Sequence, residues 1–122
     1  MNQRNCRLRN HLIIGKEYWS RKDNRGVTVT KDGLTLVIKG ILFNSAIVKR
    51  IIDENGYDTF WINYCNWKTR TTTAAMNACI PGGWNVSGGK LHTPQRATIT
   101  IPDTGWVKLE DPLDTYLKQW AE

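Results

Sequence analysis

Alternation of β-branched and polar residues runs through the first half of the chain and predicts antiparallel strands. In segment 27–38, two alternating runs flank the turn residues Lys31-Asp32-Gly33. An Asp-Gly step adopts positive φ readily and is typical of tight hairpin turns. We therefore predict a β-hairpin over these residues.

The next segment, 46–55, fits two structures. A helix is indicated by apolar residues at helical spacing behind a Ser45 N-cap, namely Ile47, Val48, Ile51 and Ile52. A strand is indicated because these residues are β-branched and Asn55-Gly56 is typical of a type I′ hairpin turn. We favour the strand, which extends an antiparallel meander to residue 65 with turns at Asn44-Ser45 and Asn55-Gly56.

The pattern changes after Trp67. Three threonines, at 71–73, are candidate helix caps, and the segment 74–80 is rich in alanine and stops at Pro81. We predict one short central helix there. A second hairpin over 84–93 turns at Gly88-Gly89, and strands are expected at 97–101 and 105–109.

The two ends of the chain differ from the middle. An amphipathic helix is predicted at 111–122, with an apolar stripe at Leu113, Tyr116, Leu117 and Trp120. Residues 1–10 are polar and basic, so we predict a flexible arm, followed by a short strand at 11–14. The expected fold is α+β: a mainly antiparallel β-meander sheet with a short central helix and a C-terminal amphipathic helix, in one domain over 11–122.

Charge is unevenly distributed over the 122 residues, whose net charge is +6. Residues 1–25 contain seven basic residues against two acidic ones, whereas 103–122 contain two basic against five acidic ones. Such asymmetry favours capture of a polyanion at one end, or pairing of the basic segment with the acidic one, either inside the fold or between copies in a homo-oligomer.

Several classes of protein are disfavoured by the sequence. The three cysteines lack CxxC spacing, which argues against a disulfide framework and a zinc site, so we expect reduced thiols. No apolar run has the length of a membrane span, and the N-terminus lacks the apolar core of a secretory signal, so we expect a cytoplasmic protein without membrane contact.

Motifs of the common enzyme and nucleotide-binding classes are missing, which predicts a non-enzymatic protein without a cofactor. The enzymatic alternatives are a Cys-His pair formed by Cys65 or Cys79 with His92, or a pocket that combines Arg70, His92 and a carboxylate. Isolated thiols on apolar elements are more often structural, which disfavours the pair.

The segment around the central helix is a candidate anion site. Lys68 and Arg70 flank the predicted helix start, where free N–H groups favour an anion; Trp67 and Thr72 lie beside them. The alternative is that the threonines only cap the helix and both cations are solvated.

Two further features point to nucleic acid. Trp19 lies among basic residues and is the best candidate for an exposed stacking platform, although burial is more common for tryptophan. The N-terminal cations could follow phosphates or could form a solubilising tail; the candidates are Arg4, Arg7, Arg9, Arg21, Lys22 and Arg25.

Segment 57–91 combines a strand, the run Trp67-Lys68-Thr69-Arg70-Thr71-Thr72, an alanine-rich helix containing Asn77, and a glycine-turned hairpin. In this it resembles small uncharacterised accessory proteins of bacteriophages. The resemblance implies an early or anti-defence protein that acts by binding host nucleic-acid machinery or immunity components. The net charge of +6 distinguishes this chain from the acidic phage proteins that mimic DNA, because a basic protein cannot imitate phosphate groups.

We expect a small basic protein that engages nucleic acid or a nucleic-acid-loaded complex by electrostatic capture and aromatic stacking. The alternatives are a phage-encoded inhibitor that sterically blocks a host protein, such as a CRISPR or other defence component, and a binder that sequesters a nucleotide signal.

Overall fold

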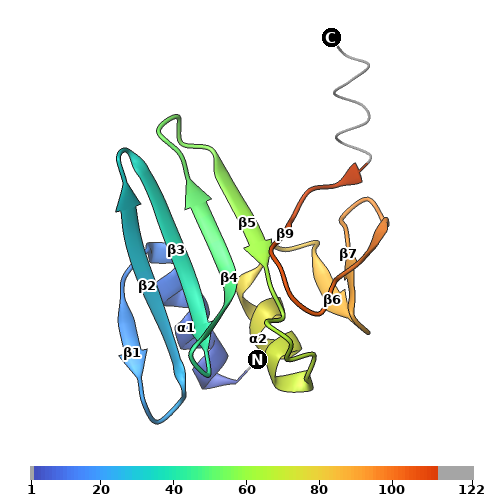
Figure 1. Cartoon of the computed structure of the whole chain (residues 1–122), viewed down its shortest axis with the longest axis horizontal. Coiled ribbons are helices and arrows are strands. Elements are labelled where there is room, and N and C mark those ends of the chain that lie inside the picture. The colour runs from blue at the N-terminus through green and yellow to red at the C-terminus, as the bar shows by residue number, and fades with distance from the viewer. Residues whose placement is uncertain (1, 113–122) are drawn as a thin grey trace.

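The computed structural model describes residues 2–112 (Figure 1). The helix predicted for 111–122, including its apolar stripe, lies outside the described residues, apart from Asp111 and Pro112. The described elements follow in the order α1 (Gln3–Ile14), β1 (Tyr18–Ser20), β2 (Arg25–Asp32), β3 (Thr35–Leu42), β4 (Ser45–Ile52), β5 (Asp58–Ile62), α2 (Arg70–Cys79), β6 (Asn85–Ser87), β7 (Lys90–His92), β8 (Thr98–Thr100) and β9 (Val107–Lys108).

Most strands form one antiparallel sheet in the order β1-β2-β3-β4-β5-β9. Strands β1 to β5 are sequential neighbours, as the predicted meander requires. After β5 the chain leaves this sheet to form α2 and a small sheet, β6-β7-β8, and then returns as β9 beside β5. The α+β class with a mainly antiparallel sheet is therefore confirmed.

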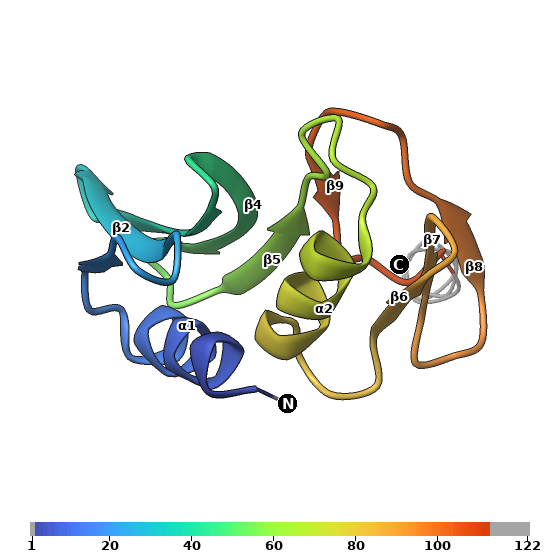
Figure 2. The same cartoon turned by 90° about the horizontal axis from the view of Figure 1, so that it is seen from below.

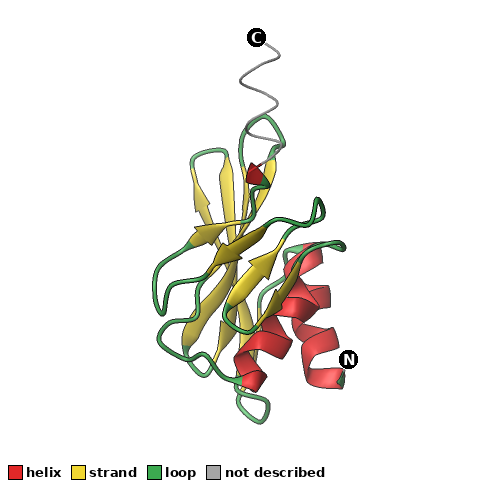
Figure 3. Ribbon diagram, turned by 90° about the vertical axis from the view of Figure 1, so that its right-hand side faces the viewer, coloured by secondary structure: helices red, strands yellow, loops and turns green. Residues whose placement is uncertain are grey.

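Both helices pack on the same face of the six-stranded sheet, as Figures 2 and 3 show. Helix α1 contacts β2 and β3, α2 contacts β3 and β4, and the two helices contact each other. The core between helices and sheets consists of buried apolar side chains: Leu8, Leu12, Val27, Ile38, Leu42, Ile47, Val48, Ile62, Tyr64, Ala75, Met76, Cys79, Ile80, Val86, Leu91 and Ile101. The opposite face of the sheet carries neither of these helices.

The N-terminal segment is a packed helix, so the predictions of a flexible arm at 1–10 and of a strand at 11–14 were wrong. Asn2 caps α1 by accepting a hydrogen bond from the backbone N–H of Asn5, and Gly15 ends the helix at φ 68°. Leu8 and Leu12, one turn apart, are fully buried. The mostly polar sequence concealed this narrow apolar stripe, and the run 11–14 looked strand-like although Ile13 and Ile14 are exposed.

The predicted hairpins formed, with two changes at the turns. The hairpin over 27–38 is confirmed, and so is the strand interpretation of 46–55. A tight turn with positive φ at both central residues, as type I′ requires, lies at Phe43-Asn44, one residue earlier than predicted. At Asn55-Gly56 the predicted type I′ turn was wrong: Asp53 Oδ1 accepts from two backbone N–H groups and holds a longer loop, in which Gly56 has positive φ and Asn55 does not.

The second half follows the predicted order. Helix α2 covers most of the predicted helical segment, but it begins after Thr69, whose side chain is the N-cap in place of the threonines at 71–73. The β6-β7 hairpin turns at Gly88-Gly89, both with positive φ, as expected. Asn77 joins α2 to this hairpin by donating to the carbonyl of Val86 at 2.9 Å and accepting from its N–H at 2.7 Å. The backbone N–H and carbonyl of Val86 point away from β7, so the Asn77 side chain supplies the hydrogen bonds that a neighbouring strand would otherwise provide.

Candidate nucleic-acid interface

The N-terminus of α2 is built around a threonine cap. Thr69 Oγ1 accepts from the backbone N–H of Thr72 at 3.2 Å and lies 3.1 Å from Thr72 Oγ1. Thr72 is buried, with 3% of its surface exposed. The hydroxyl of Thr72, which we predicted as a ligand contact, therefore serves the cap, in line with the structural alternative.

Lys68, also predicted as a ligand contact, is held by the protein itself. Its Nζ donates to the carbonyl oxygen of Ile101 at 2.9 Å and lies 3.1 Å from Asp103 Oδ1. These contacts attach the segment before α2 to the segment after β8. The Lys68 ammonium group is already engaged by a backbone carbonyl and by Asp103, so Lys68 is a weaker anion contact than its sequence position indicated.

Arg70, the first residue of α2, is exposed and has no carboxylate partner among residues 2–112. It lines a cleft of about 650 Å³ together with Tyr64 and Asn77. It also lines a second hollow, of about 310 Å³, where it meets Arg4. Arg70 thus connects two neighbouring depressions of the surface.

Arg4 connects the second hollow to a third. This third hollow, of about 590 Å³, is lined by Arg4, Arg7 and Lys22. Arg7 stacks over the Tyr18 ring, with 4.8 Å from its guanidinium carbon to the ring centre. Arg4 lies 3.6 Å from Asp23, but its side chain is 59% exposed, so this ion pair is weak.

Lys22, Arg7, Arg4 and Arg70, which we call the basic path, therefore follow one another along adjoining hollows. Beneath the path lies Arg25, one of the predicted N-terminal cations. It is 4% exposed and its Nε donates to Asn5 Oδ1 at 3.0 Å, so the expectation of a surface cation at this position was wrong. Burial, and secondarily the charge of Arg4, lower the pKa of Arg25. This fixed charge adds to the positive potential of the hollow between Arg4 and Arg70.

An aromatic hollow adjoins the path. Phe43 and Trp67, exposed by 57% and 63%, line it together with Thr69, Thr71 and Thr72, and its volume is about 420 Å³. Thr71 also lines the hollow shared by Arg4 and Arg70. The sequence indicated Trp67 as a site residue but not Phe43. The one feature of the sequence that could have indicated an exposed ring at Phe43 is its position next to Asn44, in a tight turn.

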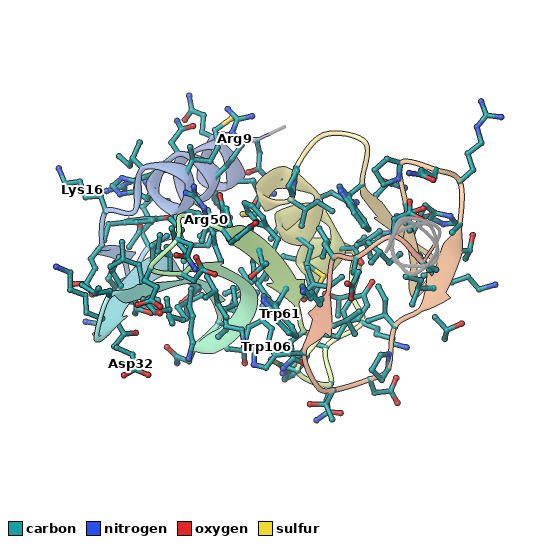
Figure 4. All side chains as sticks on the ribbon, turned by 90° about the horizontal axis from the view of Figure 1, so that it is seen from above. Arg9, Lys16, Asp32, Arg50, Trp61 and Trp106 are labelled. Carbon is teal, nitrogen blue, oxygen red and sulfur yellow. The ribbon has the colours of Figure 1, made fainter. Side chains whose placement is uncertain are left out.

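Three predicted site residues lie elsewhere. Arg9, labelled on α1 in Figure 4, lines a separate hollow beside Ile13 and Pro81. Arg21 is exposed in the turn between β1 and β2 and lines none of the hollows described above. Trp19 is opposite Gly26 across the β1-β2 pair and is 51% exposed, so one part of its ring is available.

Cys65, Cys79 and His92 have structural surroundings in which the alternative Cys-His pair does not form. Cys65 Sγ donates to the carbonyl oxygen of Ala46 at 3.2 Å, and burial raises the pKa of Cys79 to about 12. His92 Nδ1 lies 3.4 Å from Thr98 Oγ1. Neither thiol is hydrogen-bonded to His92, and a thiol whose pKa is so high is a poor nucleophile near neutral pH.

Comparisons with protein-family models, with curated proteins and with solved structures found no match to this chain. Within residues 2–112, no group of three or more histidine, cysteine or acidic side chains is arranged to hold a metal ion. Neither helix of this part of the chain has the length and apolar character needed to cross a membrane.

Proposed function

We propose that this protein binds single-stranded nucleic acid, with phosphates along the basic path and a base in the aromatic hollow. The observation that carries the proposal is that Arg4 and Arg70, which come from different helices, line one hollow above the buried Arg25. Cations gathered from distant segments provide the sequence-independent affinity that phosphate binding requires.

The aromatic hollow favours a single strand over a duplex. Phe43 and Trp67 are exposed, and exposed rings are a stacking surface for unpaired bases. Bases within a duplex stack on each other and present only their edges. Thr71 lines both the aromatic hollow and the hollow shared by Arg4 and Arg70, so the two hollows adjoin. A strand whose phosphate is bound by these arginines would therefore have a base next to the aromatic rings.

The proposal is tested by fluorescence anisotropy with a labelled oligothymidine and a labelled duplex at low salt. The double variant Arg4→Gln/Arg70→Gln should lose affinity by roughly tenfold or more, since two phosphate contacts are removed. The control Lys31→Gln/Lys90→Gln removes the same charge from two exposed lysines outside the basic path.

Equal loss in both double variants would show that only total charge matters, which would overturn the assignment to the basic path. Failure of the wild-type chain to bind any oligonucleotide at low salt would overturn the proposed function.

A further inference from the structure

The face of the six-stranded sheet opposite the helices carries an ordered row of side chains. Cross-strand pairing places Lys39 opposite Lys49, Lys49 opposite Trp61, and Trp61 opposite Lys108. Directly paired residues point to the same face, so β3, β4, β5 and β9 each contribute one member. At roughly 4.8 Å per strand spacing, the row is about 14 Å long.

The centre of the row is an ammonium group between two indole rings. Lys49 Nζ lies 4.9 Å from the centre of the Trp61 ring and 4.4 Å from that of Trp106. Lys108 Nζ lies 5.9 Å from the Trp61 ring. Figure 4 shows Trp61 and Trp106 close together on the side of the sheet away from α1.

The lysines of this row lack acidic partners in the described part of the chain, where all three ion pairs involve other cations. Lys39 and Lys49 are like charges on directly opposed positions, an arrangement that destabilises a sheet. Burial, and secondarily the charge of Lys39, lower the pKa of Lys49. An anion on this face would relieve the repulsion, so the row is complementary to a negatively charged partner.

We propose that this face is a second contact surface for single-stranded nucleic acid, with bases stacking on Trp61 and Trp106 and phosphates paired with Lys39, Lys49 and Lys108. The choice of ligand rests on the proposed function, but the surface is separate: the basic path lies on the helix side, and this row lies on the opposite side of the sheet. One strand that passes from one side to the other would contact both.

Interaction strengths favour a base over the resident ammonium group. The cation–π contact of an ammonium group is generally weaker than the stacking of a base on an aromatic side chain. An arriving base can therefore displace Lys49 from the indole rings. The displaced ammonium group then becomes available to a phosphate of the same strand.

An acidic protein segment is the competing occupant, and the rings distinguish the two. A carboxylate-rich peptide would use the lysines but would gain little from the indole faces, whose electrostatic potential attracts cations and not anions. Nucleic acid would contact both the lysines, through its phosphates, and the indole rings, through its bases. The test therefore includes a probe that carries charge without bases.

The experiment measures binding of labelled oligothymidine to the full chain by anisotropy and by quenching of tryptophan fluorescence. Trp61→Leu and Trp106→Leu should each weaken binding by about tenfold, as expected for loss of one stacked base. Lys49→Gln should weaken it more than Lys31→Gln, the charge-matched control at the end of β2. Circular dichroism checks folding, and Lys49→Gln and Trp106→Leu still test the surface if Trp61→Leu does not fold.

The outcomes separate this inference from the proposed function. If the sheet variants bind like wild type while Arg4→Gln/Arg70→Gln binds weakly, the inference is overturned and the proposed function stands. If the sheet variants alone lose affinity, the sheet face is the binding surface and the basic path is not. If polyglutamate competes as well as oligothymidine, the row recognises charge alone, and the stacking proposal is overturned in favour of an acidic partner.

Discussion

Arg25 Nε donates a hydrogen bond to Asn5 Oδ1 at 3.0 Å, and both side chains are almost completely buried. Arg25 Nη1 also donates to the carbonyl oxygen of Asp23 at 2.7 Å. The guanidinium therefore links the first turn of α1 to the turn before β2. A buried cation needs such acceptors, because an unpaired charge in the interior is strongly unfavourable.

Replacing Asn5 by alanine should lower the free energy of unfolding by roughly 2–3 kcal/mol, because Arg25 would remain buried with one acceptor lost. Urea unfolding followed by circular dichroism measures the change. Asn10→Ala, at an exposed position on the same helix, is the matched control and should change stability by less than about 0.5 kcal/mol. Equal effects of both variants would contradict the importance of the buried pair.

Replacement by alanine should affect Gly26 much more than Gly40. A Cβ atom at Gly26 would overlap the Trp19 ring and lie 2.7 Å from the carbonyl oxygen of Tyr18, whereas one at Gly40 would lie 3.7 Å from Leu8 Cδ1, an ordinary contact. We expect Gly26→Ala to destabilise the protein by about 2–3 kcal/mol and Gly40→Ala to change stability by less than about 1 kcal/mol. Thermal melting compares the two, and comparable melting temperatures would argue against the close packing of Trp19 on Gly26.

The salt dependence of binding reports on the basic path. If its four cations each neutralise one phosphate, the slope of log K against log salt should be about −2.8 for a single strand and about −3.6 for a duplex. Titrations between low and moderate salt give this slope, and Arg4→Gln/Arg70→Gln should reduce its magnitude by about 1.4 on the single strand. An unchanged slope in this variant would show that neither arginine contacts a phosphate.

The buried thiol of Cys79 should make the protein less stable at alkaline pH. Its pKa is raised from the ordinary value of 9.0 to about 12 by burial, so above pH 9 the unfolded chain loses the thiol proton while the folded chain keeps it. The unfolded state is then favoured as pH rises, by up to about 1.4 kcal/mol per pH unit, until the folded thiol also ionises. Below pH 9 the contribution is fully present.

Urea unfolding at pH 8 and pH 10 measures this effect in the wild type and in Cys79→Ala. The wild type should lose about 1 kcal/mol more than the variant over this range, because the tyrosines and other thiols titrate in both proteins. An identical loss in the two proteins would show that the thiol of Cys79 does not contribute.

Local signals were the reliable part of the prediction. The hairpins over 27–38 and 84–93 were recognised because turn glycines and alternating β-branched residues act within a few residues of each other. The helix before Pro81 was recognised for the same reason, although its cap was Thr69. The type I′ turn predicted at Asn55-Gly56 did not form, because the Asp53 carboxylate accepts two backbone hydrogen bonds and stabilises a longer loop.

The sequence by itself determined the antiparallel strands, the short central helix and the presence of excess positive charge, because these depend on residue type and short-range spacing. Only the tertiary structure decided that residues 3–14 form a helix, because burial of Leu8, Leu12 and Asn5 depends on partners in distant strands. It also decided which cations meet: helix packing brings Arg4 to Arg70, and strand register aligns Lys39, Lys49 and Lys108 with Trp61. Register and packing are set by contacts between segments far apart in the chain, which no local pattern contains.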